Sequence, residues 1–152
     1  MAEQRIPKII HFCWFGGKEK PSKVQKCIES WHKYLSDYEF MEWNESNFDI
    51  NSNEYVKQAY QEKKFAYVSD YARIKALYQY GGIYMDTDVM VYKSFDDLLD
   101  NQCILGFEEK NYIATSFMAC VPKHELIKEF IDKYENVSFY NSDNSLDLTT
   151  NV

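Results

Sequence analysis

Apolar residues recur along the chain in two spacings, as short continuous or alternating runs and as longer stretches with an apolar position every three or four residues. The run from Lys8 to Phe15 is nearly continuous and stops at Gly16-Gly17, which predicts a buried strand followed by a flexible loop. Helical spacing begins at Pro21-Ser22, and alternation over Tyr38 to Trp43 predicts a second strand. The apolar positions of the intervening helix are Val24, Cys27, Ile28, Trp31 and Leu35. This β-α-β order indicates an α/β fold.

The middle of the chain, from Ser52 to Tyr80, has helical spacing. Asn53 is the predicted N-cap, because its side chain can accept a hydrogen bond from a free amide of the first turn. An interruption is expected near Lys63-Lys64-Phe65. Gly81 is predicted to end the second part, because glycine adopts the usual C-terminal backbone conformation of a helix without steric cost. We therefore expect two successive helices that end at a glycine.

The chain from Gly81 onward predicts three strands and two helices. The stretch from Gly81 to Tyr92 is the most β-prone run of the sequence and predicts a buried strand. Ser94 is expected to cap a short helix, strands are expected over Cys103 to Phe107 and over Tyr112 to Val121, and Pro122 is expected to open a final helix. The apolar face of that helix comprises Leu126, Ile127, Phe130, Ile131 and Tyr134.

Composition limits the number of domains. With 152 residues, 45% of them hydrophobic and 17% aromatic, the chain fits one domain with a hydrophobic core. We expect this domain to occupy residues 1–137. Residues 138–152 are rich in Ser, Asn, Asp and Thr and carry too few apolar side chains to bury, so a polar loop or a frayed end is expected there. Four cysteines without CxxC spacing indicate neither a zinc site nor a disulfide framework.

Net charge and apolar run lengths exclude several functions. A formal charge of −7 without a basic stripe argues against nucleic acid as a partner, and it means that any bound phosphate needs local positive charge. No signal peptide is recognisable, and no apolar run approaches the roughly 20 residues that span a bilayer, so no transmembrane segment is expected. A cytoplasmic protein is the expectation.

Two carboxylates lie close together within the predicted strand of Gly81 to Tyr92. Asp86 and Asp88 would project from one face of a strand, where their repulsion is relieved by a cation, and hard oxygen ligands suit Mg²⁺ or Mn²⁺. The alternative is a solvated turn, since Asp and Thr both bond to nearby backbone. Apolar residues at Ile83 to Met85 and Val89 to Val91 favour the metal site, because an unpaired charge in a buried strand is costly.

Two motifs of this chain carry a family resemblance. The run from Ile6 to Gly17 is one. The other comprises Ser69 to Arg73, the helix end from Leu77 to Gly82, and the strand from Ile83 to Asp88. In order and context these resemble the DXD sugar-binding region of glycosyltransferase family 32, over roughly Ile6 to Tyr134. That family includes capsular-polysaccharide transferases and yeast initiating mannosyltransferases, and it is related to the clostridial toxin glucosyltransferases.

The resemblance implies a fold and a reaction. The fold is GT-A, a Rossmann-like α/β fold, which we expect to lack its C-terminal portion because family members generally continue past this point. The implied function is metal-dependent, retaining transfer of a hexose from UDP-hexose or GDP-hexose, with Mn²⁺ or Mg²⁺ as cofactor. The implied acceptor is a glycan or a lipid-linked molecule in surface or capsular polysaccharide synthesis, which leaves peripheral membrane association open.

The resemblance also implies roles for five residues. Asp88 would ligate the metal directly, and Asp86 would reach the ribose hydroxyls or the metal through water. Asp70 and Arg73 are the implied catalytic residues, which bind donor-sugar hydroxyls and stabilise the departing group; their alternative is an intrahelical ion pair worth about 0.3–0.5 kcal/mol. Trp14 would stack on the nucleotide base, and its alternative is a core tryptophan.

Three further side chains near these motifs are interpreted as interior residues. His11 lies inside an apolar strand, where a lone histidine is more often a hydrogen-bonded core residue than a ligand. Tyr80 and Tyr84 are interpreted as packing residues.

Other functions remain open from the sequence. Asp86 to Met90 matches the DxDx(T/V) nucleophile motif of haloacid-dehalogenase-type phosphatases except for the final Met, but such chains usually carry the motif near the N-terminus with most of the domain after it. A non-catalytic sugar-nucleotide binding fragment is the second alternative. A purely structural interaction module is the third, and it leaves the acidic pair unexplained.

Overall fold

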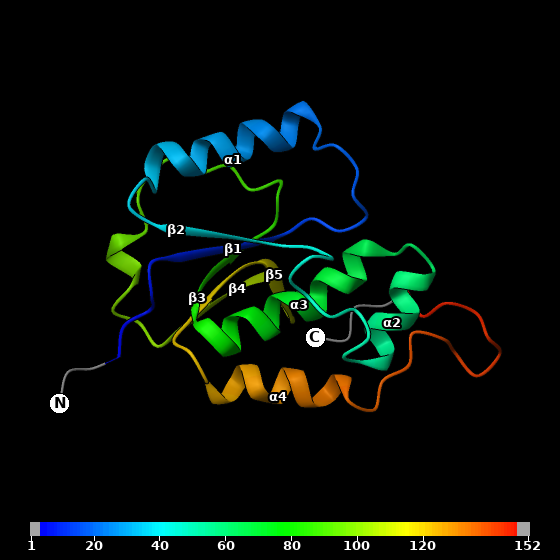
Figure 1. The fold of residues 1–152 in the computed structure, drawn as a ribbon. Coiled ribbons are helices and arrows are strands. Elements are labelled where there is room, and N and C mark those ends of the chain that lie inside the picture. The colour runs from blue at the N-terminus through cyan, green and yellow to red at the C-terminus, as the bar shows by residue number, and fades with distance from the viewer. Residues whose placement is uncertain (1–3, 149–152) are drawn as a thin grey trace.

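A five-stranded mixed sheet with helices on both faces forms the protein, as the computed structural model describes it for residues 4–148 (Figure 1). The strands are β1 (Ile9–Cys13), β2 (Glu39–Trp43), β3 (Gly82–Met85), β4 (Cys103–Glu109) and β5 (Tyr112–Cys120). The helices are α1 (Ser22–Tyr34), α2 (Glu54–Gln61), α3 (Phe65–Tyr80), the 3₁₀ turn η1 (Asp96–Leu98) and α4 (Glu125–Tyr134). The mixed α/β architecture that the sequence predicts is confirmed.

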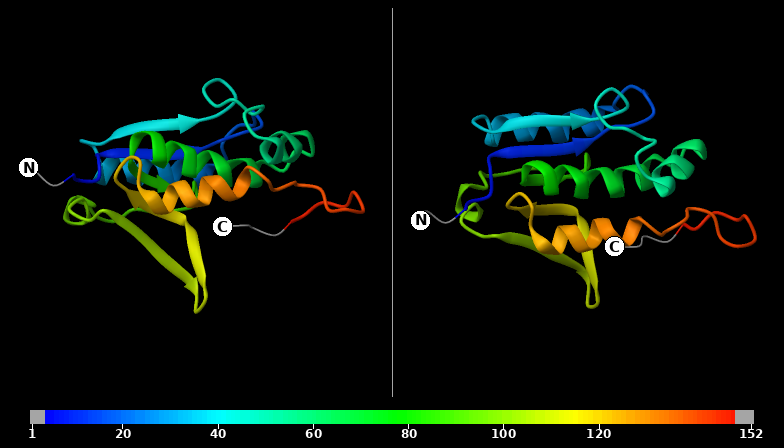
Figure 2. Two further views of the ribbon diagram at one scale, coloured as in Figure 1. Left: turned by 90° about the horizontal axis from the view of Figure 1, so that it is seen from below. Right: turned by 60° about the horizontal axis from the view of Figure 1, so that its bottom comes forward.

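The sheet order is β2-β1-β3-β5-β4, in which β2, β1 and β3 are parallel and β5 and β4 are antiparallel to their neighbours. Helix α1 covers one face, and α3 and α4 cover the other (Figure 1). Figure 2 shows β4 and β5 as a hairpin that extends beyond the helices. The chain leaves β1 toward β2 on one side and returns to β3 on the other, so the carboxyl ends of β1 and β3 form a topological switch point, where ligands of α/β folds bind.

The local signals for the two central helices are confirmed. The side chain of Asn53 accepts a hydrogen bond from the amide of Val56 at 3.1 Å and caps α2. Gly81 follows the last residue of α3 with φ of 65°, and its amide donates to the carbonyl of Leu77. The final helix begins later than predicted: α4 starts at Glu125, and His124 caps it, because its ring accepts a hydrogen bond from the amide of Leu126 at 3.2 Å.

The predicted strand through Tyr92 is wrong beyond Met85. A turn follows, in which the amide of Val89 donates to the carbonyl of Asp86 at 3.1 Å. The chain then leaves the sheet toward α1, because the indole N–H of Trp31 donates to the Val89 carbonyl at 2.7 Å and the Val91 amide donates to the hydroxyl of Ser30 at 2.9 Å. Tertiary contacts with α1 thus override the local β propensity.

The core position of His11 is confirmed. Its side chain is fully buried, with Nε2 at 2.8 Å from the carbonyl of Gly81, and the indole of Trp43 donates to its Nδ1 at 3.1 Å. Burial lowers the pKa of His11 to about 4, so the ring is neutral at pH 7 and Nε2 carries the proton that it shares with the Gly81 carbonyl. His11 thereby fixes the start of β3 against β1.

The described part of the polar C-terminal segment, up to residue 148, is a loop with one buried anchor. The ring of Phe139 is fully buried against the rings of Tyr55 and Tyr67, and the loop is closed by a bridge between Tyr140 and Leu146. The low apolar content of the segment did not indicate this packing. The rest of the predicted segment, 149–152, lies outside the described residues. Within 4–148, no helix has both the length and the apolar character that a membrane span requires.

The start of β3 yields a stability prediction. Gly82 has φ of 114°, and a Cβ there would lie 2.6 Å from the carbonyl oxygen of Ile9 on the neighbouring strand. Gly82→Ala should therefore lower the free energy of unfolding in urea by roughly 2–4 kcal/mol. Gly106→Ala is the control, because a Cβ at Gly106 meets nothing within 4 Å. Equal effects of the two changes would contradict the close approach of β1 and β3.

Candidate active site

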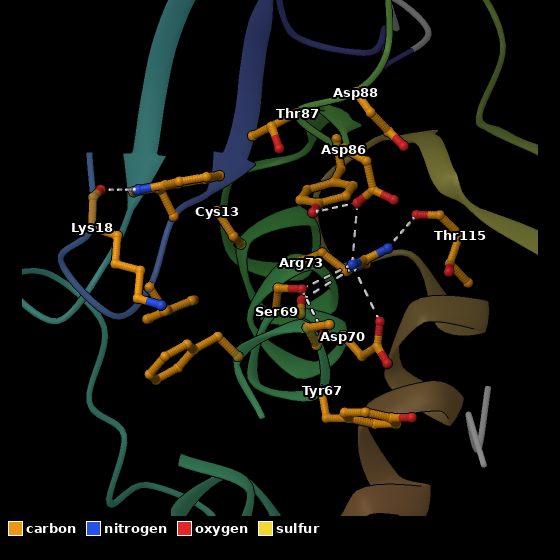
Figure 3. A pocket seen from close by; sticks show the side chains of 15 residues that line it. Cys13, Lys18, Tyr67, Ser69, Asp70, Arg73, Asp86, Thr87, Asp88 and Thr115 are labelled. Carbon is orange, nitrogen blue, oxygen red and sulfur yellow. Dashed lines mark hydrogen bonds and ion pairs between the residues drawn. The ribbon is translucent and has the colours of Figure 1, made fainter. Parts of the chain in front are cut away.

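A cavity of about 620 Å³ opens at the carboxyl ends of β1 and β3, at the switch point of the sheet (Figure 3). Its volume lies in the range of small-molecule sites. The cavity wall is built from the segment after β1, the first half of α3, the turn after β3, and β5. All five residues that the sequence predicts for the site line it: Trp14, Asp70, Arg73, Asp86 and Asp88.

Arg73 connects three of the segments in the cavity wall. Arg73 is 4% exposed, and its guanidinium lies 3.2 Å from a carboxylate oxygen of Asp70 and 3.2 Å from one of Asp86. It also donates to the carbonyl of Thr115 on β5 at 2.6 Å, and to the carbonyl and hydroxyl of Ser69 at 3.1 and 3.0 Å. Asp70 and Arg73 are therefore part of a tertiary network. The alternative that they form only an intrahelical ion pair is wrong.

Tyr84 packs in the core, as the sequence predicts, and it also belongs to the same network. Its ring is buried and lies under the guanidinium of Arg73 at 4.4 Å, and its hydroxyl donates to Asp86 at 2.8 Å. The signal in the sequence was its position two residues before Asp86 in β3. Tyr80 is 38% exposed and packs beside the rings of His11 and Trp43.

Asp86 and Asp88 differ in their surroundings. They lie in the turn after β3, so the expectation that they project from one strand face is wrong, although both still line the cavity. Asp86 is half-buried and engaged by Arg73 and Tyr84. Asp88 is exposed, and within residues 4–148 its carboxylate has no hydrogen bond or ion pair, so its oxygens are free to bind a ligand.

The charges of the cavity favour a cation. Three carboxylates and two cationic side chains line it: Asp70, Asp86, Asp88, Lys18 and Arg73. A diphosphate entering this net negative cavity needs further positive charge, and hard carboxylate oxygens are the ligands that Mg²⁺ and Mn²⁺ prefer. Residues 4–148 contain no cluster of three or more His, Cys, Asp or Glu that could hold a metal. Asp88, whose carboxylate is free within the described chain, is the residue of the cavity that would hold such a cation.

Trp14 lines the cavity and is hydrogen-bonded to Lys18, which lies across the cavity from Asp70 (Figure 3). Its indole N–H donates to the carbonyl of Lys18 at 2.7 Å, and the ammonium of Lys20 lies 5.7 Å from the centre of its ring. Because the indole N–H is already engaged, Trp14 can offer a ligand only the face of its ring. That arrangement suits stacking on a planar base.

Sequence reasoning missed three residues of the site. Ser69 lines the cavity next to Asp70 and holds Arg73, and its place in the motif was the signal that could have revealed it. Lys18 follows the double glycine after β1, a position where a loop residue often meets a ligand. Thr115 acts through its backbone carbonyl, which leaves no signal in the sequence.

Comparisons with known proteins agree with this geometry. The family model described as "Glycosyltransferase sugar-binding region containing DXD motif" matches residues 21–105. Inositol phosphoceramide mannosyltransferase 1 of Schizosaccharomyces pombe is 28% identical over 150 residues, which cover 91% of this chain and 44% of the relative. Lactosylceramide 4-alpha-galactosyltransferase of Homo sapiens is 32% identical over 71 residues, which cover 44% of this chain and 19% of the relative. The chain thus spans less than half the length of these curated relatives.

Among solved structures, PaToxG glycosyltransferase superposes with a TM-score of 0.67 at 19% identity, over 85% of this chain and 59% of that one. This match shows that the chain has the fold of GT-A type glycosyltransferases over that part. The GT-A fold predicted from the sequence is confirmed.

Asp70 yields a pH prediction. It is 8% exposed, and desolvation raises its pKa to about 6 although Arg73 opposes the shift. Between about pH 4 and 6 the folded state therefore holds a proton that the unfolded chain has lost. The stability that this proton contributes is present below the unfolded pKa and is lost as pH rises through 6. Relative to Asp70→Asn, the wild type should lose about 1–3 kcal/mol of unfolding free energy between pH 4 and pH 7. Urea titrations measure the difference in unfolding free energy between the wild type and Asp70→Asn. The same difference at pH 4 and pH 7 would contradict the burial of Asp70.

Proposed function

Because the chain belongs to the family of glycosyltransferase sugar-binding regions that contain a DXD motif, we propose that its cavity binds a nucleotide-diphosphate sugar as the donor for transfer of a hexose. The observation that carries this proposal is the meeting of Asp86 and Asp88 with Arg73 and Trp14 in one cavity at the switch point of the sheet. Each of these side chains matches the chemistry of one part of such a donor.

The donor is proposed to lie along the cavity from Trp14, next to Lys18, to Asp70; Figure 3 shows Lys18 and Asp70 on opposite sides of the cavity. The base stacks on the face of the Trp14 ring, because the indole N–H is already bonded to the Lys18 carbonyl. The sugar lies at the other end, where the carboxylate of Asp70 accepts hydrogen bonds from its hydroxyls. The diphosphate then lies between them, beside the turn that carries Asp86 and Asp88.

Asp88, with Asp86 through water, is proposed to hold Mn²⁺ or Mg²⁺ against the diphosphate. When bound, such a cation neutralises the charge that develops on the diphosphate as the sugar–phosphate bond breaks. The free oxygens of Asp88 and the net negative charge of the cavity support this assignment. The engagement of Asp86 by Arg73 and Tyr84 supports the indirect role for Asp86.

Arg73 is proposed to hold Asp70 and Asp86 at the positions that the donor requires. Its contacts with both carboxylates, with Ser69 and with the Thr115 carbonyl occupy most of its N–H groups. Misplacement of such positioning groups by about 1 Å can cost 10²-fold in rate. Direct contact of Arg73 with the departing diphosphate, and retention of configuration at the sugar, stay predictions.

The names of the relatives guide the proposal for the sugar and the acceptor. A mannosyltransferase and a galactosyltransferase that act on ceramide lipids are both similar to this chain, so we propose mannose or galactose as the hexose and a glycolipid as the acceptor. A part in surface or capsular polysaccharide synthesis and a cytoplasmic location stay predictions. The phosphatase alternative finds no support, because the family match is to glycosyltransferases and Asp86, its nucleophile, is held by Arg73 and Tyr84.

Isothermal titration calorimetry tests the proposal. The chain is titrated with UDP-glucose, UDP-galactose and GDP-mannose, each with Mn²⁺ and with the metal chelated. Saturable binding of at least one donor that requires the metal is the expected result. Absence of binding for all three donors in the presence of Mn²⁺ would contradict the proposed function.

The metal assignment makes a sharper prediction. Asp88→Asn should weaken metal-dependent binding of the donor about tenfold or more, because an amide replaces the free charged ligand. Asp97→Asn is the matched control, since Asp97 is an exposed acid on η1 that does not line the cavity. Its affinity should stay within about twofold of the wild type. If both changes weaken binding to the same degree, Asp88 is not the metal ligand.

A further inference from the structure

Lys18 lines the cavity at the end of a short loop, Gly16 to Lys18, that follows Trp14 and Phe15 after β1. We propose that the ammonium of Lys18 binds the nucleoside-proximal phosphate of the donor, and that the loop positions the Lys18 side chain for this contact. The inference rests on the proposed function, and it adds a residue that determines specificity for phosphate over the bare nucleoside.

The backbone of this loop is held from two sides. The amide of Gly16 donates to the carboxylate of Glu45 at 2.5 Å. On the other side, the ring of Phe65 lies so close that a Cβ at Gly16 would be 2.5 Å from it, and Gly16 and Gly17 have φ of 95° and 70°, which glycine adopts readily. The loop therefore has a defined path at the edge of the cavity.

A hydrogen bond from Trp14 holds Lys18 next to the proposed binding position of the base. The indole N–H of Trp14 donates to the Lys18 carbonyl at 2.7 Å, so the ring proposed to stack on the base also fixes the backbone of Lys18. The Lys18 side chain lines the cavity across from Asp70 (Figure 3). A phosphate attached to a nucleoside that stacks on Trp14 therefore passes closer to Lys18 than to Asp70.

Of the two cationic side chains that line the described cavity, Lys18 is the one that is free to bind a phosphate. The other cationic side chain in the wall, Arg73, is buried and already paired with Asp70 and Asp86. Within the described chain, the ammonium of Lys18 forms no ion pair, hydrogen bond or cation–π contact. Lys20, by contrast, is paired with Glu42 at 2.5 Å and does not line the cavity.

The chemistry of an ammonium matches the proposed ligand. Lysine presents three N–H donors as a compact positive charge, a common way of binding phosphate. With the metal on the Asp88 side and Lys18 on the Trp14 side, the two phosphates of the donor would each meet a positive charge. Because Lys18 is exposed, its contribution should weaken as ionic strength rises.

Two lysine variants test the inference. Lys18→Met and Lys23→Met remove the same charge from exposed positions five residues apart, but Lys23 lies on α1 and does not line the cavity. The first probe is UDP or GDP, whichever the wild type binds more tightly, and the second is the corresponding nucleoside. Each is titrated by calorimetry in the presence of Mn²⁺. Thermal unfolding of both variants checks that they fold.

We expect Lys18→Met to weaken binding of the nucleoside diphosphate about tenfold, to leave binding of the nucleoside within about twofold, and to reduce the salt dependence of nucleotide binding. Lys23→Met should stay within about twofold of the wild-type affinity for both probes, and Lys18→Arg should retain most of the affinity. Equal losses for nucleotide and nucleoside, or wild-type affinity in Lys18→Met, would overturn the role of Lys18 while the proposed function stands. If the wild type binds neither nucleoside diphosphate, the proposed function and this inference both fail.

Discussion

The buried guanidinium of Arg73 is the interaction on which the candidate active site depends. Removing a charged group from water costs several kcal/mol unless charges and hydrogen bonds compensate it. Here the compensation comes from Asp70 on the same helix, Asp86 after β3, and the Thr115 carbonyl on β5. Three segments that are distant in the sequence must therefore meet around one side chain. The same contacts that make its burial tolerable also place the two carboxylates in the cavity.

The sheet topology brings these segments within reach of one another. Because the chain runs from β1 to β2 on one side and returns to β3 on the other, a crevice forms between the carboxyl ends of β1 and β3. His11 fixes the two strands against each other through the carbonyl of Gly81, and Gly82 allows their close approach. Trp14 and Asp86, which follow the two strands, consequently face one cavity. The location of the site is a property of the fold, and its charges are a property of a few side chains.

Much of this arrangement could be predicted from the sequence, because it depends on local signals. Helical spacing around Trp31, the cap at Asn53 and the stop at Gly81 gave the helices, and the motifs gave the five residues that line the cavity. The path after Met85 could not be predicted, since contacts of Val89 and Val91 with α1 decide it. The hydrogen bond of Tyr84 to Asp86 and the carbonyl of Thr115 depend equally on tertiary structure, and the latter has no side-chain signal at all.

The central claim is that a divalent cation and a nucleoside diphosphate bind together at the ends of β1 and β3. Anomalous diffraction from crystals soaked with Mn²⁺ and the nucleoside diphosphate tests it most directly, because the manganese signal locates the metal independently of any model of the ligand. The expected result is a manganese peak coordinated by an oxygen of Asp88 and by phosphate oxygens, with the base on Trp14. A manganese peak and a diphosphate bound elsewhere, with the cavity lined by Asp70 and Arg73 left free, would contradict the claim.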